Sequence, residues 1–396
     1  MPIFARDPDA AADRAQQREL ARLGMLTPGN GSAALPGAGL PPGAGSLPGA
    51  GVMFCPYQPI TSGSSRLRAW QVAPHLRKLG WRAAVIPAGC SLEERRARIA
   101  RFQPDLLVLL RTLHPLNDPT LYAPSPDVPG TPCLIDIDDA DYTHPDRKPA
   151  LDAGLAASAG AICGSRNVAR YCQQHAPFAR VVWTGCEPTP GNPAPGNATP
   201  GSATEAHNAN RDPIVAWGAT SFTRYNHEAD LVEEAIAQVA QQRPVTLHIY
   251  GARKKRYAAP MAERLRAAGT GVRVFPLLSY DKFLKNLRRA AVGLQVISPE
   301  HAYAEGKSFG KVLAYLDADS AVVASNAVDH PLFFTHGRNG LLADPTPDSW
   351  AHAIAQLLDD PADRSRMVSE ARQDFHNRLT AQAAAKQLDK ALRKAL

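Results

Sequence analysis

The sequence has no apolar run long enough to cross a membrane. A spanning helix needs about 20 predominantly apolar residues, and no such stretch occurs in the chain. The N-terminal segment MPIFARDPDAAADRAQQREL also lacks the apolar centre that a secretory signal requires. We therefore expect a cytoplasmic protein, and peripheral attachment at the inner face of the membrane stays open as an alternative.

Cysteine is scarce, and no two cysteines form a C-x-x-C pair. The six cysteines lie at positions 55, 90, 133, 163, 172 and 186, mostly among apolar neighbours. This spacing favours reduced, packed thiols over metal or redox chemistry.

Acidic residues are outnumbered by basic ones, which gives a net charge of +7. A basic surplus favours anionic partners such as phosphates, nucleic acid or acidic lipid head groups. The basic residues are dispersed, however, and no group of stacking aromatics accompanies the run ARKKRY at 252–257. We therefore expect no nucleic-acid binding.

Two segments lack hydrophobic periodicity. Residues 1–50 read as a low-complexity N-terminal tail, in which LPGAG and PPGAG repeats follow a charged, alanine-rich stretch that suits a helix. Residues 187–212 read as a Pro/Gly/Asn-rich linker or disordered insertion, because they exceed an ordinary loop in length. These segments delimit a first domain at 51–186 and a second at 213–375, followed by a C-terminal helix at 376–396.

Both domains alternate short apolar strands with amphipathic helices. In the first domain a strand at 51–57 precedes a helix at 66–80, and the apolar run from residue 105 is typical of a strand buried on both faces. The second domain starts with a strand at 213–219 and a helix at 228–242. Repeated units of this length predict an α/β fold with two doubly wound parallel sheets.

A glycine-bounded turn enters a helix in the second domain. Its residues are Gly306, Lys307, Ser308, Phe309 and Gly310. Such a turn exposes unpaired backbone N–H groups and the positive end of the helix dipole. The glycines permit close backbone approach, the serine can donate a hydrogen bond, and the lysine adds a positive charge. We expect a diphosphate to bind here, and the alternative is a capped helix with a solvated lysine.

The residues around this turn resemble a known family. The segment AEGKSFGKVLAYLDADSAVVASNAVDHPLFFTHGRNGLLADPTPDSWAHAIAQLLDDPADRSRMVSEAR, at 304–372, is similar to the donor-binding half of GT-B glycosyltransferases, in particular family 4. The resemblance implies two facing Rossmann-like domains, with a nucleotide-sugar donor on the second and a hydroxyl acceptor, a glycan or a lipid-linked one, on the first. It also implies sugar transfer in bacterial glycan, polysaccharide or glycolipid synthesis, with retention of configuration and without a cofactor or an essential metal.

The resemblance also assigns roles to single residues. It places Glu305 beside the transferred sugar and Arg224, with His227 as a weaker candidate, beside the donor diphosphate. Arg253 occupies the base-binding side of the donor site, and Gly63, in the first turn of the first domain, lies near the donor phosphates. For Arg224 and Arg253 a plain surface role is the alternative.

Candidate acceptor residues lie in the first domain. The strand-like segment LIDIDDADY ends in several aspartates, at the edge where α/β proteins assemble sites. Many family members carry a histidine near this place, so Asp138 or Asp139 is expected to orient the acceptor hydroxyl or to accept its proton. Alternating aspartates also suit a divalent metal, which is the alternative reading. Arg66 and His114 are further acceptor candidates.

One departure from the family pattern affects the donor site. Retaining members carry a second glutamate near the ribose, and Ala314 stands at that place here. Asp317 or Asp319 could compensate for the missing carboxylate. Otherwise the chain could be a catalytically impaired nucleotide-sugar-binding protein, and a nucleotide-sugar epimerase of the same fold is a further alternative.

Overall fold

The computed structural model describes residues 8–23, 25, 49–124, 130–189, 211–219, 222, 225–252 and 255–396. They form two compact units. Unit 1 runs to Cys163 and adds Val168–Val182 and Ala384–Leu396, whereas unit 2 comprises Gly164–Asn167 and Trp183–Ala383. Most of the expected linker and the repeats of the expected tail lie outside the described residues.

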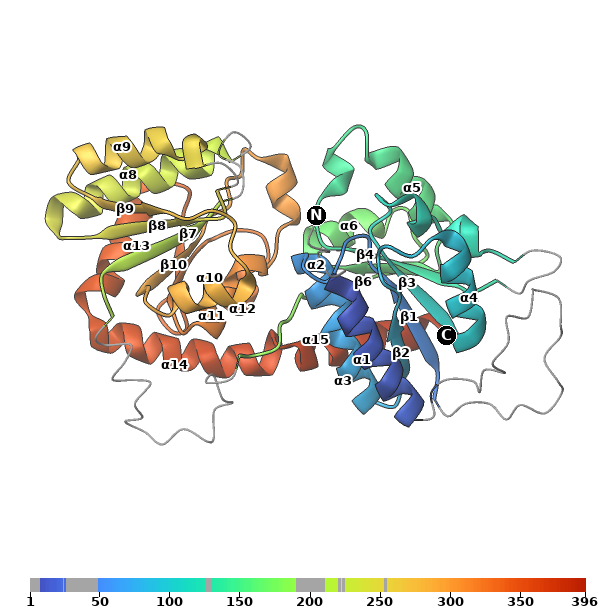
Figure 1. Ribbon diagram of the computed structural model, residues 1–396. Helices are drawn as coiled ribbons and strands as arrows, with labels where there is room; N and C mark the ends of the chain where they lie inside the picture. The colour runs from blue at the N-terminus through green and yellow to red at the C-terminus, as the bar shows by residue number, and fades with distance from the viewer. Residues whose placement is uncertain are drawn as a thin grey trace, which may run out of the picture. The chain divides into compact units, whose positions relative to one another are not determined.

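Unit 1 is built on a six-stranded parallel sheet, as the sequence predicts (Figure 1). Along the sheet the order is β2-β1-β3-β4-β5-β6, so the chain changes direction between β1 and β3. In such sheets ligands bind outside the carboxyl ends of the strands at this point. The strands are β1 (Gly51–Cys55), β2 (Arg82–Val85), β3 (Leu106–Leu110), β4 (Cys133–Ile137), β5 (Gly160–Cys163) and β6 (Ala179–Val181).

Helices cover both faces of this sheet. One face packs on α3 and α15, through side chains such as Leu76 and Leu388. The other packs on α4, α5, α6 and α1, through Phe102, Leu151 and Leu20. The helices are α1 (Pro8–Arg22), α2 (Gly63–Ser65), η1 (Arg66–Trp70), α3 (Val72–Lys78), α4 (Leu92–Phe102), η2 (Pro115–Asn117), η3 (Pro119–Tyr122), η4 (Asp141–Thr143), α5 (Lys148–Ala156), α6 (Arg166–Cys172) and α15 (Ala381–Ala395).

Both ends of the described chain join unit 1. Helix α1 lies within the segment that the sequence analysis treats as a tail, and it packs on the edge strand β2. The C-terminal helix α15 contributes apolar residues to the core on the opposite face of the sheet. Neither helix could be assigned to this unit from local sequence alone.

Unit 2 has a second six-stranded parallel sheet, in the order β12-β11-β10-β7-β8-β9. This is the Rossmann order, with the change of direction between β7 and β10. Helices α8, α9 and α13 lie against one face, in one hydrophobic core with the strands. The strands are β7 (Ile214–Gly218), β8 (Thr246–Tyr250), β9 (Gly271–Val274), β10 (Val292–Gln295), β11 (Ala321–Ser325) and β12 (Leu341–Ala343). The helices are α8 (Asn226–Gln242), η5 (Lys255–Tyr257), α9 (Ala259–Ala267), α10 (Tyr280–Leu287), η6 (Ala302–Gly306), α11 (Gly310–Asp317), α12 (His330–Phe333), α13 (Pro347–Asp359) and α14 (Pro361–Arg378).

The six cysteines are free thiols, which confirms the prediction from their spacing. Burial raises the pKa of Cys55 to about 12, so its reactive thiolate form is suppressed. Within the described ranges no helix combines the length and the apolar character that crossing a bilayer demands.

Candidate functional site

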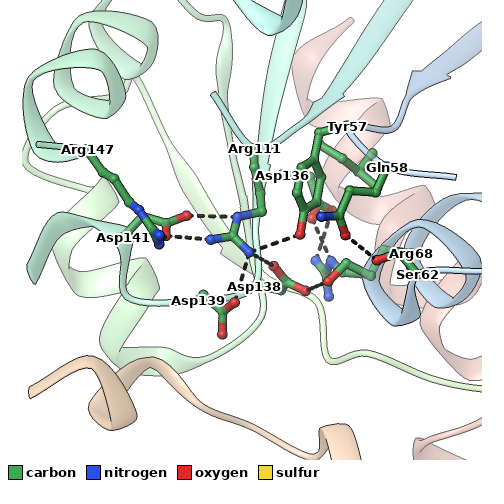
Figure 2. A network of polar contacts seen from close by, with 12 residues as sticks. Tyr57, Gln58, Ser62, Arg68, Arg111, Asp136, Asp138, Asp139, Asp141 and Arg147 are labelled. Carbon is green, nitrogen blue, oxygen red and sulfur yellow. Dashed lines mark hydrogen bonds and ion pairs between the residues drawn. The ribbon is translucent and has the colours of Figure 1, made fainter. Parts of the chain in front are cut away.

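An arginine-centred network occupies the carboxyl ends of β3 and β4 in unit 1 (Figure 2). Arg111 binds Asp141 with two bonds, from Nε to Oδ2 at 2.9 Å and from Nη2 to Oδ1 at 2.5 Å. Its Nη1 donates to Asp139 Oδ2 at 2.9 Å and to the Tyr57 hydroxyl at 3.2 Å. Arg147 Nη1 also donates to Asp141, at 3.0 Å. The network therefore borders the topological switch point of this sheet, since Tyr57 follows β1 and Arg111 follows β3.

The backbone of Arg111 supports a functional reading of the network. Its φ is +61°, in the left-handed region that non-glycine residues rarely adopt. Such strain concentrates at functional sites. Burial opposes the positive charge, yet the neighbouring carboxylates of Asp138, Asp139 and Asp141 raise the pKa of Arg111 above its usual value. The guanidinium is a permanent charge that fixes the positions of the aspartates.

A second buried arginine lies beside this network. Arg68 Nε and Nη2 bind the two carboxylate oxygens of Asp136 at 2.6 and 2.9 Å. Burial raises the pKa of Asp136, and the Arg68 charge opposes that rise. Breaking a buried pair of this kind is strongly destabilising, so the pair anchors β4 below the site.

Asp138 differs from the other aspartates of the cluster. Its Oδ2 accepts a hydrogen bond from Ser64 Oγ at 2.5 Å, and its Oδ1 lies 4.0 Å from Arg111 Nη1. That Oδ1 is buried and has no hydrogen-bond partner among the described residues. A carboxylate oxygen in this condition can accept a hydrogen bond from a substrate hydroxyl. The carboxylate of Asp139 already binds Arg111. Asp138 is therefore better placed than Asp139 to contact an acceptor.

The aspartates pair with arginines instead of converging on one point. Within the described part of the chain, no group of three or more histidine, cysteine or carboxylate side chains has an arrangement that could hold a metal ion. Three arginines face four aspartates in this cluster, which leaves one excess negative charge.

The remaining candidates of unit 1 have simpler surroundings. Gly63 is exposed at the start of α2, and a Cβ atom added to it would meet nothing within 4 Å. Arg66 is half-buried at the start of η1. His114 caps η2, where its Nδ1 accepts a hydrogen bond from the Leu116 N–H at 3.1 Å. Burial lowers the pKa of His114, with a further contribution from the charge of Arg95.

The predicted glycine-bounded turn of unit 2 leads from η6 into α11. Glu305 and Gly310 are exposed, and Lys307 Nζ lies 4.8 Å from the centroid of the Tyr303 ring. Ser308 is buried, and its Oγ has no hydrogen-bond partner within the described ranges. The ring of Phe309 is fully buried against Phe333, so this residue can face a ligand only with its backbone.

Lys311 is a candidate that the sequence analysis missed. It is the second residue of α11, and its Nζ donates to the carbonyl of Gly218, the last residue of β7, at 2.5 Å. The side chain remains exposed, but its ammonium group lies between α11 and the carboxyl end of β7. Partial desolvation lowers its pKa to about 8, and the charge of Lys307 adds to this effect. A positive charge in the first turn of a helix interacts unfavourably with the helix dipole. A lysine at this position is therefore a sequence signal for a functional role.

Both aspartates that could replace the missing glutamate contact other parts of the protein. Asp317 accepts hydrogen bonds from the Thr189 backbone N–H and hydroxyl, at 2.8 and 3.1 Å. Asp319 forms a bidentate ion pair with Arg372. Both carboxylates thus hold partners within the protein, and Ala314 is 3% exposed, so compensation by either aspartate stays a prediction.

Two further donor candidates, Arg224 and Arg253, lie outside the described residues. His227, the weaker alternative to Arg224, is described at the start of α8. Its Nδ1 lies 3.1 Å from Glu300 Oε2, in the loop after β10.

Comparison with known proteins finds a family match within unit 2. Residues 213–360 match the family model described as "Glycosyl transferases group 1". This match contains β7, Lys311 and the whole glycine-bounded turn. No curated protein matches the sequence significantly.

Solved structures extend the similarity to most of the chain. Sucrose-phosphate synthase from Thermosynechococcus elongatus matches with a TM-score of 0.62 and 14% identity, covering 87% of this chain and 98% of that one. HepE from Anabaena, solved in complex with UDP and glucose, matches with a TM-score of 0.59 and 13% identity, covering 87% and 100%. WaaG, a glycosyltransferase involved in lipopolysaccharide biosynthesis, matches with a TM-score of 0.56 and 12% identity, covering 86% and 99%. The structural similarity at these low identities shows the fold alone, which is the GT-B fold.

Proposed function

We propose that the protein is a glycosyltransferase that moves a sugar from a nucleoside-diphosphate sugar to a hydroxyl group of a glycan or lipid-linked acceptor, with retention of configuration. The observation that carries the proposal is the position of Lys311. It lies at the switch point of the Rossmann-ordered sheet, inside the segment that matches the glycosyltransferase family.

In this proposal the donor diphosphate binds at the start of α11. The free backbone N–H groups of its first turn and the helix dipole attract the phosphates. Lys311 and Lys307 add positive charges, and the buried Ser308 hydroxyl, which has no hydrogen-bond partner in the described part of the chain, can bond to a phosphate oxygen. As the bond to the sugar breaks, negative charge grows on the departing diphosphate, and these groups stabilise it.

The acceptor binds on unit 1 at the Arg111 network. The Oδ1 of Asp138, which has no hydrogen-bond partner among the described residues, accepts a hydrogen bond from the reacting hydroxyl and orients its oxygen. Ser64 and Arg111 hold the carboxylate in place. The excess negative charge of the network selects a neutral hydroxyl over a phosphorylated group.

UDP-sugars are the donors to test first, because HepE was solved with UDP-glucose and with UDP. The experiment is a thermal-shift and calorimetric screen against nucleoside diphosphates and their sugars, since a ligand of the folded state alone raises its stability. We expect at least one nucleoside-diphosphate sugar to bind and to release its diphosphate on turnover.

Two alternatives are separated by the same screen. The first alternative is a nucleotide-sugar-binding protein of impaired activity, which would bind the donor without turnover. It is motivated by Ala314 and by the contacts that Asp317 and Asp319 make within the protein. An epimerase would convert the donor sugar without any acceptor. Both outcomes would contradict the proposed transfer.

The basic residues of the segment 66–80 suit attachment to an acidic membrane surface, and the alternative is that the segment covers the sheet, which its contacts in unit 1 support. Its apolar side chains Leu67, Trp70 and Leu76 are buried in the core. Its residues Arg68 and Arg77 bind Asp136 and Glu19. A lipid-linked acceptor would therefore have to be held through its glycan part or through another surface.

A further inference from the structure

Helix α1 completes the exposed edge of the unit 1 sheet. Strand β2 is the edge strand, and the amide of Gln16 pairs with its backbone in the manner of a neighbouring strand. Gln16 Nε2 donates to the Val85 carbonyl, and Gln16 Oε1 accepts from the Val85 N–H, both at 2.8 Å. A side chain that satisfies both groups of one strand residue fixes the helix along the sheet and in register.

Other contacts hold α1 along its length. Leu20 is fully buried in the sheet core. Asp13 forms a bidentate ion pair with Arg98, at 2.9 and 3.1 Å, and Glu19 binds Arg77 at 2.6 Å. The helix is therefore a docked part of unit 1.

The first turn of α1 reaches two loops at the carboxyl edge of the sheet. Asp9 is 2% exposed. Its Oδ1 accepts a hydrogen bond from the Ile60 N–H at 2.6 Å, and its Oδ2 accepts one from the Ala88 N–H at 3.1 Å. Ile60 lies in the loop after β1, and Ala88 lies in the loop after β2. One buried carboxylate thus ties together the first two loops of the unit through charge-assisted hydrogen bonds.

The loop held by Asp9 also carries residues of the candidate acceptor site. Tyr57, three residues before Ile60, receives a hydrogen bond from Arg111, and Ser64, four residues after it, donates to Asp138. Displacement of Ile60 would therefore move both contacts. A misplacement of about 1 Å at a reacting group can cost roughly 10²-fold in rate.

We propose that Asp9 is a positioning residue for the acceptor site, acting through the loop at residues 56–62. The inference rests on the proposed function for its catalytic consequence. Its structural part, the ordering of this loop by α1, can be measured independently of any activity.

The test compares Asp9→Asn with Asp13→Asn, a matched change one turn further along the same helix that leaves both loops untouched. Hydrogen–deuterium exchange of the full chain is measured for residues 56–64. We expect exchange there to become at least about tenfold faster in Asp9→Asn and to stay within twofold of the wild type in Asp13→Asn, because only the first variant weakens a hydrogen bond to a charged group at Ile60. Equal exchange of this loop in both variants would overturn the proposal.

The catalytic readout uses UDP-glucose with water as the acceptor, together with the Kd for UDP. We expect the turnover of Asp9→Asn to fall about tenfold or more while its Kd for UDP stays within twofold, since the diphosphate site belongs to unit 2. If Asp9 only stabilises the fold, the turnover of Asp9→Asn should fall in proportion to the fraction of unfolded protein. This result would refute the positioning role.

A third variant guards against loss of folding. Asp9→Ala keeps no acceptor oxygen, whereas Asp9→Asn keeps its amide oxygen, so loop exchange in Asp9→Asn should fall between that of the wild type and that of Asp9→Ala. If the wild type transfers no sugar from any nucleotide-sugar, the proposed function fails, and loop exchange alone decides the role of Asp9.

Discussion

Replacing Lys311 with methionine should weaken donor binding without loss of the fold. The ammonium group lies 2.5 Å from the carbonyl of Gly218, at the start of α11, where the donor diphosphate is proposed to bind. Hydrogen bonds to a charged group contribute about 1.5–3 kcal/mol. Their loss predicts a Kd for UDP that is about 10- to 150-fold higher.

The same lysine predicts a pH dependence of donor binding. Its pKa is lowered from 10.5 to about 8. The folded protein therefore binds fewer protons than the unfolded chain between these values, and the contribution of this residue to stability rises with pH across that window. An anionic donor favours the protonated form, so donor affinity should fall by about fivefold between pH 8 and pH 9.

Calorimetry at pH 7, 8 and 9 measures both effects. Lys311→Arg keeps its charge throughout this range and should bind UDP with little change in affinity. Lys285→Met, on the exposed side of α10, is the matched control and should behave as the wild type. A wild-type Kd in Lys311→Met, or an equal pH slope in Lys311→Arg and the wild type, would refute the role of Lys311.

Three other substitutions test the remaining parts of the site and the fold. Asp138→Asn should lower turnover about 10²-fold or more with an unchanged Kd for UDP, as steady-state kinetics and calorimetry would measure; equal losses in both would contradict an acceptor role. Arg111→Met leaves buried aspartates without their cation, so urea unfolding should report a loss of about 3–5 kcal/mol, and a change below 1 kcal/mol would be inconsistent with the network. In Gly293→Ala the new Cβ would lie 2.4 Å from Tyr315 Cγ, so unfolding should show a loss of about 1–3 kcal/mol, whereas unchanged stability would mean that the ring moves freely.

The strands of both sheets were predictable because their residues are locally distinctive. The run at Leu106–Leu110 is apolar throughout and became a fully buried central strand. The expected helix at 66–80 is interrupted, because a π-helical segment at Arg66–Trp70 precedes α3. This irregularity depends on the burial of Arg68 against Asp136, a partner 68 residues away.

Contacts between distant residues set the limits of sequence-based prediction at the site. The aspartates near Asp138 were identified from their place after a strand, but their partner Arg111 was not, since nothing local marks its left-handed backbone. The docking of α1 was missed for a similar reason. From its sequence alone, this charged, alanine-rich helix is indistinguishable from part of a tail. Its place in unit 1 depends on Gln16 and Asp9, which bind a strand and a loop more than 50 residues away.

Sugar transfer is the central claim, and product analysis with UDP-sugars tests it most directly. Purified protein is incubated with each donor, and NMR follows both UDP release and the configuration of the liberated or transferred sugar. The account predicts UDP release with the anomeric configuration of the donor retained, and a large loss of this turnover in Asp138→Asn. Tight donor binding without UDP release, or conversion of the donor into its epimer, would contradict it.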